Sequence, residues 1–364
     1  MHAALSLALT LALLAPSADA AEWRTMLGGE FNADPHGALD LGWRAGDWQL
    51  QLITDTLDVR WQPEHEQGRS WVAARAEAGA AGLMISPWAS GAPVPEAALT
   101  AFYAGAEGGR VRYLPGGLYV GIDGQARWWW FGDLDTIDRV VPRGQARGEA
   151  AASLGWWSEQ GQAWLRAGAH VAPDAGRIAL DSPLFTREPG APIRAAGLGA
   201  TGQPVQPFVQ LVAKTRPAGW TVAPRGELRA GWSQGQDAVS RTRLGGLNPY
   251  VVPVAGAAWA EFWVDTYAAA RLGPSLELGS LRVDAVVDAA AWRSATDWGR
   301  NPAPTPVTHA VGFGLLTRVK PNRLRVDLDA GLAPWLPRQE GIAWSVWSAV
   351  SVDWGQGGLR APAG

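Results

Sequence analysis

The sequence predicts an all-β fold, an antiparallel transmembrane β-barrel of about 16 strands. Three observations support it: an N-terminal segment typical of an export signal, repeated segments in which apolar and polar residues alternate, and turn-forming residues between them. In an extended strand, such alternation separates an apolar face from a polar one. After the signal, no stretch reaches the roughly 18 apolar residues of a spanning helix, and lipid cannot satisfy open strand edges, so a membrane form must be a closed barrel.

The first residues have the features of a signal peptide. An apolar run from Ala3 to Ala15 is followed by Ala18-Asp19-Ala20, which fits cleavage before Ala21. We therefore expect a signal peptide at 1–20, an outer-membrane β-barrel at 21–354 and a C-terminal tail at 355–364. At about 20–22 residues per strand and connection, this barrel holds about 16 strands, and an even number from about 12 to 18 is acceptable.

Composition excludes several classes of function. The net charge is −3 and the basic residues are scattered, which gives no case for nucleic-acid binding. The chain has no cysteine, and the histidines after the signal are isolated from one another, so we expect no disulfide, no metal and no cofactor. The 22 tryptophans suit a membrane–water interface, and the 45 glycines suit turns and curved strands. The expected partners are outer-membrane lipid and, during insertion, the barrel assembly machinery.

The alternating segments follow one another along the whole chain. We interpret as strands, wholly or in part, residues 48–52, 57–61, 72–78, 118–131, 163–172, 227–232, 260–266, 281–289, 311–315, 323–332 and 346–354. A phase slip at 54–56 indicates a bulge or a turn. Pro274, 302–306, 321–322 and 334–337 are interpreted as breakers, and 173–206 as a long loop on the outside of the cell.

One of these segments, 118–131, carries two further predictions. Asp123-Gly124 stands between two apolar runs, which is a strong signal of a hairpin turn. Trp128, Trp129 and Trp130 follow this turn and predict part of an interfacial aromatic girdle.

The charged side chains of the last strands are expected to line the lumen. At the membrane midplane, an arginine on the lipid face of a barrel costs roughly 2–4 kcal/mol, so the polar parity must face inward. The resulting candidate lumen charges are Arg282, Asp284, Asp288, Arg323, Arg325, Asp327 and Asp329. They could form a selective pathway or gate, or only a lattice of ion pairs that fills the lumen.

Two enzyme-like motifs favour no chemistry in their context. Gly231-Trp232-Ser233-Gln234-Gly235 matches the nucleophile pattern, but a polar turn follows it where a hydrolase has a helix. The glycine pattern at 197–202 resembles a dinucleotide site, but it is followed by Gln203-Pro204 within a predicted loop. We therefore expect no catalytic and no cofactor-binding residue.

The C-terminal third, residues 243–354, resembles the bacterial surface-antigen family, the BamA/TamA-type barrels of protein insertion and secretion. The family shows a Gly-Gly turn, a loop with Val/Ile-Arg-Gly-Phe/Tyr, a strand resembling Phe-x-Asp-x-Gly, a Gly-x-Gly strand, an Arg-x-Asp strand and a terminal aromatic strand. The matching segments here are Leu244-Gly245-Gly246, Val254-Ala255-Gly256-Ala257, Val286-Val287-Asp288-Ala289-Ala290, Gly312-Phe313-Gly314, Leu324-Arg325-Val326-Asp327 and the strand that ends at Trp354.

The resemblance implies a 16-strand barrel in a form without the periplasmic POTRA domains of the family. It also implies a loop motif at Val254 and Gly256 that lies near Asp288, and a closing-strand aromatic at Trp354. Ala255 stands where the family has arginine, so Asp288 is expected to lack its usual charge partner. A simple porin-like channel and an outer-membrane acyl hydrolase remain as alternatives to transport or outer-membrane protein biogenesis.

Overall fold

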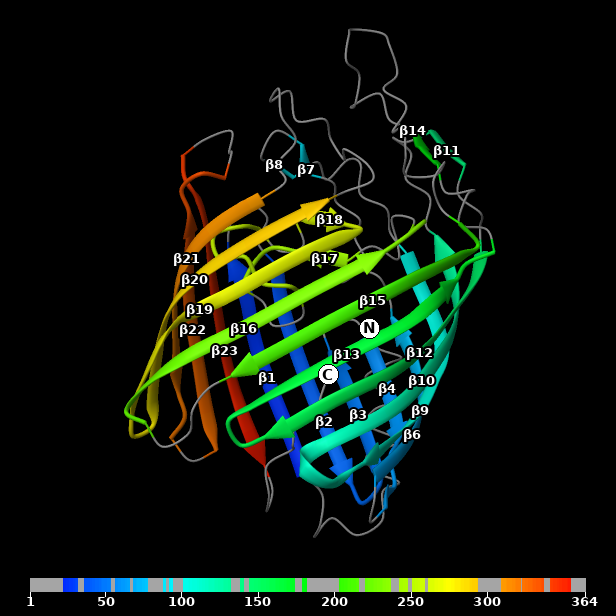
Figure 1. Ribbon diagram of the computed structural model, residues 1–364, viewed down its shortest axis with the longest axis horizontal. Coiled ribbons are helices and arrows are strands. Elements are labelled where there is room, and N and C mark those ends of the chain that lie inside the picture. Colours follow the sequence, from blue (N-terminus) through cyan, green and yellow to red (C-terminus); the bar gives the residue numbers. More distant parts are fainter. Residues whose placement is uncertain are drawn as a thin grey trace, which may run out of the picture.

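A computed structural model shows a closed antiparallel barrel with a wall of 16 strands (Figure 1). The structure describes residues 22–31, 36–53, 56–65, 68–77, 88–89, 92–93, 101–131, 138–140, 144–173, 179–181, 203–215, 220–236, 242–247, 251–258, 261–293, 309–321, 323–336 and 341–354. The predicted signal peptide at 1–20, the glycine pattern at 197–202 and the tail at 355–364 lie outside these residues. Within the described ranges, no helix combines the length and the apolar character needed to cross a membrane.

The strands of the wall succeed one another along the chain, each pairing with its neighbours. They are β1 (Glu22–Phe31), β2 (His36–Ala45), β3 (Trp48–Ile53), β4 (Thr56–Trp61), β6 (Gly68–Glu77), β9 (Ala101–Tyr113), β10 (Leu118–Phe131), β12 (Gly144–Ser158), β13 (Gly161–Val171), β15 (Val205–Thr215), β16 (Val222–Ser233), β19 (Thr266–Leu278), β20 (Leu281–Arg293), β21 (His309–Val319), β22 (Leu324–Ala333) and β23 (Ala343–Trp354).

Shorter strands lie in the connections. The two-residue β5 (Glu64–His65) extends the sheet beside β6. Three small two-stranded sheets are formed by β7 (Trp88–Ala89) with β8 (Ala92–Pro93), by β11 (Asp138–Val140) with β14 (Ala179–Asp181), and by β17 (Thr242–Leu244) with β18 (Phe262–Val264).

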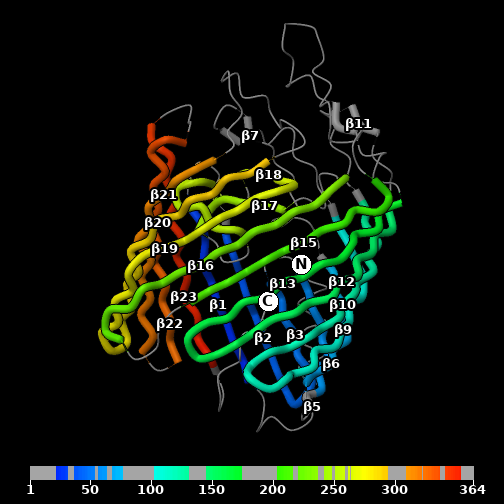
Figure 2. The backbone as a smooth tube through the Cα atoms, in the orientation of Figure 1, coloured from blue at the N-terminus to red at the C-terminus, as the bar shows by residue number. Residues whose placement is uncertain are grey.

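The barrel closes where its first strand meets its last. β1 pairs with β23 from Trp23 opposite Trp354 to Phe31 opposite Val346. The tube view shows the inclined strands that closure requires (Figure 2). No turn links these two strands directly, so this seam is held by strand pairing and side-chain packing alone.

The two rims differ in the length of their connections. At one rim, which we call the turn rim, strands are joined by connections as short as residues 46–47, 159–160 and 279–280. At the other, the loop rim, connections run as long as 78–100 and 234–265. Outer-membrane barrels have short turns on the periplasmic side and long loops outside the cell. We therefore assign the turn rim to the periplasm.

β22 shows the two faces of the wall clearly. Leu328 and Leu332 are 54% and 52% exposed on the lipid face, whereas Asp327, on the opposite face, is 7% exposed. Directly opposed residues of neighbouring strands share a face, so the register extends this division to β21 and β23. The apolar parity therefore meets lipid and the charged parity lines the lumen.

Leu328→Arg tests this register directly. The substitution is expected to destabilise the barrel by about 2–4 kcal/mol, because it places a charge near the membrane midplane. Leu324→Arg, at the first residue of the same strand, is the matched control, with an expected cost of about 0–1 kcal/mol near the interface. Urea titration of the barrel folded in lipid vesicles measures both, and equal costs would contradict the assigned depths.

One local prediction in 118–131 is wrong. Asp123 and Gly124 do not form a turn but lie inside the continuous strand β10. The chain instead reverses at the 3₁₀ turn Pro115–Gly117, where Gly116 and Gly117 have φ values of 76° and 80°. Of the three tryptophans, Trp128 and Trp130 are exposed on the lipid face, whereas Trp129 is buried and packs against Tyr103 in a tilted arrangement, with ring centroids 4.8 Å apart.

Candidate functional site

The lumen contains a segment of the chain, described at residues 242–247 and 251–258, which we call the inserted segment. It belongs to the long connection between β16 and β19 at the loop rim, and β17 pairs its start with β18. Leu244, Val254, Ala255 and Ala257 are fully buried. They pack in two clusters with inward side chains of the wall, among them Trp292 in one and Trp347 in the other. Such burial shows that the described part of this connection folds back into the barrel.

Polar side chains of the wall hold the main chain of the inserted segment. The Ala255 N–H donates to Asp288 Oδ2 of β20 at 2.8 Å, and the Gly256 N–H donates to Ser345 Oγ of β23 at 3.1 Å. The Leu247 N–H donates to Glu30 Oε1 of β1 at 3.3 Å. These three contacts tie the segment to strands on both sides of the β1–β23 seam.

Two further bonds involve described residues at the end of the segment. Arg229 Nη1 of β16 donates to the carbonyl oxygen of Val251 at 3.3 Å. The Ala258 N–H donates to Glu261 Oε2 at 2.9 Å, which fixes the return of the chain toward β18. The segment is therefore anchored along its length and not only at its tip.

Glycines allow the segment to touch the wall. A Cβ atom added to Gly312 of β21 would lie 2.0 Å from the Ala255 carbonyl oxygen. Gly256 has φ +81°, and a Cβ there would lie 2.2 Å from the Ala333 backbone nitrogen. An added Cβ atom would clash at both positions, because main chain packs directly on main chain there. Gly312 and Gly256 belong to the two glycine motifs singled out in the sequence.

Asp288 receives its charge partner from the neighbouring strand. Arg271 of β19 stands directly opposite it and forms two hydrogen bonds, Nε to Oδ1 at 2.6 Å and Nη2 to Oδ2 at 2.7 Å. The two side chains are 8% and 1% exposed. Asp288 therefore has a charge partner on the wall, Arg271, although Ala255 of the inserted segment offers none.

The other candidate charges of the C-terminal strands mostly form ion pairs on the inner wall. Asp284 pairs with Arg282 of its own strand and with Arg225 of β16. Asp327 pairs with Arg325 at 2.7 Å and with Arg318 of β21 at 2.8 Å. These contacts match a lattice of ion pairs along the lumen.

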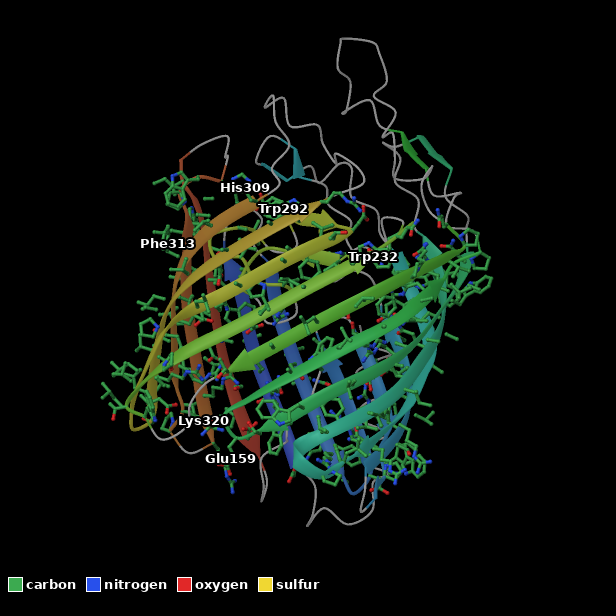
Figure 3. The ribbon with its side chains drawn as sticks, viewed as in Figure 1. Glu159, Trp232, Trp292, His309, Phe313 and Lys320 are labelled. Atoms are coloured by element: carbon green, nitrogen blue, oxygen red, sulfur yellow. The ribbon has the colours of Figure 1, made fainter. Side chains whose placement is uncertain are left out.

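Two candidate lumen charges differ from this pattern. Asp329 Oδ1 accepts the Thr317 N–H at 3.1 Å. Arg323 precedes β22, which begins at Leu324, and is exposed in the turn. It therefore lies at the turn rim, as Glu159 and Lys320 do in Figure 3, and not on the wall of the lumen.

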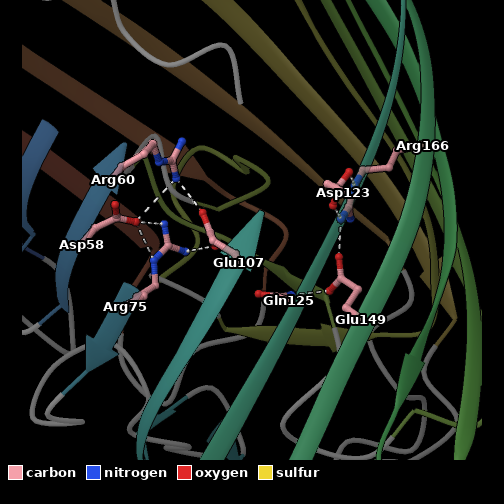
Figure 4. A network of polar contacts seen from close by, with 8 residues as sticks. All are labelled: Asp58, Arg60, Arg75, Glu107, Asp123, Gln125, Glu149 and Arg166. Atoms are coloured by element: carbon pink, nitrogen blue, oxygen red, sulfur yellow. Dashed lines mark hydrogen bonds and ion pairs between the residues drawn. The ribbon is translucent and has the colours of Figure 1, made fainter. Parts of the chain in front are cut away.

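The wall far from the inserted segment carries two more ion-pair networks (Figure 4). In the first, Arg75 donates to Asp58 at 2.6 and 3.0 Å, and Arg60 donates to Glu107 at 2.6 Å. In the second, Arg166 of β13 bridges Asp123 of β10 and Glu149 of β12. Asp123 thus has a lumen partner, which explains why Asp-Gly can lie in the middle of a strand.

The remaining sequence candidates do not form a catalytic group in the described chain. Ser233 Oγ donates to the Asp265 carbonyl oxygen at 2.8 Å, whereas His170 Nδ1 lies 3.0 Å from Glu149. The described residues contain no group of three histidine, aspartate or glutamate side chains that could hold a metal ion. The backbone of Trp354 ends β23 opposite Trp23.

Sequence reasoning missed Glu30, Ser345, Arg271 and Gly312 as contacts of the inserted segment or of its anchor. Glu30 and Ser345 have no motif of their own, and their role follows only from barrel closure. Arg271 was hidden because Pro274 was interpreted as a breaker, whereas Pro274 lies inside β19 opposite Pro224 of β16. If the alternation of apolar and polar residues had been followed through Pro274, it would have placed Arg271 on the inward face of this strand.

Comparison with known proteins places the fold. No family model and no curated protein matches the chain. Among solved structures, CdiB from Acinetobacter baumannii matches with a TM-score of 0.58 and 12% identity, over 92% of this chain and 60% of that one. BamA from Haemophilus ducreyi lacking POTRA domains 1–3 matches with 0.58 and 8%, over 92% and 70%. CdiB from Escherichia coli matches with 0.55 and 13%, over 93% and 64%.

At these identities the likeness shows a shared fold. The chain spans less than two thirds of the length of the two CdiB structures. The prediction of an antiparallel β-barrel of about 16 strands is confirmed, and its fold is similar to those of BamA and CdiB.

Proposed function

We propose that this barrel acts in transport across the outer membrane or in the biogenesis of outer-membrane proteins, and that it is not an enzyme. The observation that carries the proposal is the inserted segment, bonded to Asp288, Ser345 and Glu30 on the inner wall. Passage through the part of the lumen that this segment fills then requires the segment to move. The barrel neighbours, BamA and CdiB, support a role of this kind.

The inserted segment disfavours a simple diffusion channel. Porins of 16 to 18 strands keep an open aqueous lumen, whereas this barrel fills part of it with buried main chain packed on Gly312 and Gly331. A permanently open pore would not need glycines at the wall positions that contact this segment. The acyl hydrolase alternative is disfavoured because Ser233 Oγ is occupied by a main-chain carbonyl.

Transport through the lumen and biogenesis at the wall make different demands on the barrel. Passage through the lumen needs the inserted segment to move, while the wall stays closed. Insertion of a client strand into lipid needs the wall itself to open. The β1–β23 seam joins the first and the last wall strand, which are not consecutive along the chain. Opening at this seam therefore separates two strands without stretching a connection between them.

A disulfide across the seam separates these two demands. The chain has no cysteine, and Leu27 and Val350 are directly opposed on β1 and β23. Oxidised Leu27→Cys/Val350→Cys is expected to abolish any acceleration of client barrel folding into vesicles and to leave lumen conductance unchanged. Leu328→Cys/Ser348→Cys is the matched control, because it joins β22 and β23, which are neighbours in the wall and consecutive along the chain.

The readouts are protease protection of a urea-denatured outer-membrane client and ion conductance across a planar bilayer. Loss of client folding only in the seam-locked form supports biogenesis. Client folding that never exceeds empty vesicles, together with conductance that responds to release of the inserted segment, supports transport. A wild-type barrel with high and steady conductance would refute both and favour the porin.

A further inference from the structure

Two arginines interrupt the lipid-facing surface of the wall. Arg110 and Arg112 of β9 are exposed, and the register places Arg110 opposite Ile122 and Arg112 opposite Val120 of β10. Ile122 is 64% exposed on the lipid face. Opposed residues point to the same side of a sheet, so both arginines face lipid and not the lumen.

These two positions are unusual for this barrel. Among the described residues of the wall strands, the other titratable side chains of this parity are Arg293, the last residue of β20, and His309, the first of β21. Both stand at the loop rim. Arg110 and Arg112 are therefore a pair of like charges on the lipid face near the opposite rim, and Arg110 forms no ion pair with a described residue.

Their depth matches the periplasmic headgroup region. On β9 the lipid face reads Phe102, Ala104, Ala106 and Gly108 before the arginines begin. With about 3.4 Å per residue and a tilt of about 40°, the separation of Arg112 and Phe102 along the membrane normal is about 25 Å. This is the height of the apolar band of a barrel. Trp128 and Trp130 flank the upper end of this band. The long arginine stems can extend along the wall and hold both guanidinium groups at the lower headgroup level.

We propose that Arg110 and Arg112 bind the phosphate headgroup of an anionic phospholipid in the periplasmic leaflet. Guanidinium groups recognise phosphate through paired, charge-assisted hydrogen bonds. The two arginines are two residues apart on one strand, so their Cα atoms stand about 7 Å apart. Ser70 and Gly68 of β6 are the opposed neighbours on the other side, so residues with small side chains flank both arginines there. The surrounding Val72 and Ile122 contact acyl chains, so the partner reaches this surface through the lipid.

The test compares binding of two lipids to the full barrel. The purified chain in detergent is titrated with phosphatidylglycerol or phosphatidylcholine, and bound lipids are counted by mass spectrometry of the intact complex. The wild type is expected to prefer phosphatidylglycerol. Each arginine near a charged membrane surface is worth about a fivefold change in binding, so Arg110→Gln/Arg112→Gln should weaken that preference roughly 25-fold.

Arg293→Gln removes an arginine of the same face at the loop rim and is the matched control. It should keep the preference, and all variants should show the same heat-dependent migration of a folded barrel. Rising salt should reduce the preference of the wild type more than that of the double variant. An unchanged preference in the double variant would overturn the proposal. So would a double variant that keeps the preference and loses a co-purified protein, because the surface would then bind a protein.

Discussion

Gly312→Leu is expected to expel the inserted segment from its place on the wall and convert a closed barrel into a conducting one. Even a Cβ atom at this position would lie 2.0 Å from the Ala255 carbonyl oxygen. An open lumen of this strand number is an aqueous channel, so we expect a conductance roughly tenfold or more above the wild type. Recordings from single barrels in planar bilayers measure the change.

The clash should move the segment and not the wall. β21 is fixed in register on both sides, from Leu281↔Val319 to Ala291↔His309 with β20 and from Phe313↔Leu332 to Val319↔Val326 with β22. The segment is held by a few hydrogen bonds to the wall, each contributing about 0.5–1.5 kcal/mol net, and by the packing of its buried side chains in the two clusters. β21 is held by continuous strand pairing on both sides, so we expect the segment to move first.

Gly37→Leu is the matched control for this prediction. Gly37 lies on the lipid face of β2, and the nearest atom to an added Cβ is the Gly28 carbonyl oxygen at 3.9 Å. The control should fold and remain closed. A Gly312→Leu barrel that migrates as folded and stays closed would show that the inserted segment does not gate the lumen.

The alternation of apolar and polar residues determined the fold class because each face of the wall meets a different medium. A charge on the lipid side is costly, so Leu328 and Asp327 could be assigned to opposite faces without knowledge of their neighbours. The strand number followed from length alone. Turns were less predictable, because Asp123-Gly124 is a turn signal only when neither residue has a partner inside a sheet, and Arg166 gives Asp123 such a partner.

The candidate site could be predicted only in part. Gly256 and Gly312 stood out as motifs, but the packing of Gly256 on β22 and of Gly312 on Ala255 depends on how the inserted segment folds back into the barrel, which periodicity does not describe. Ala255 suggested a missing charge at Asp288, and the compensation by Arg271 lies on another strand. A single sequence shows which residue is absent from a motif. Only the structure shows which residue of another strand supplies the missing contact.

Arg271→Met is expected to cost about 3–5 kcal/mol, because it leaves the Asp288 carboxylate buried without its charge partner. Arg318→Met is the matched control: Arg318 forms a similar contact with Asp327 at 2.8 Å, but its side chain is 41% exposed. A partly exposed pair contributes about 0–1 kcal/mol. Urea unfolding from vesicles measures both, and similar losses would show that Arg271 is not a buried partner.

The double variant Arg271→Met/Asp288→Met then separates stability from gating. Replacing both members of a buried ion pair by apolar residues of similar volume is often neutral or stabilising, so most of the loss seen with Arg271→Met should be recovered. The Ala255 N–H would still lack its acceptor, since Asp288 Oδ2 holds it at 2.8 Å. We therefore expect a stable barrel whose lumen opens more often than that of the wild type. A double variant as closed as the wild type would show that Glu30 and Ser345 hold the inserted segment without Asp288.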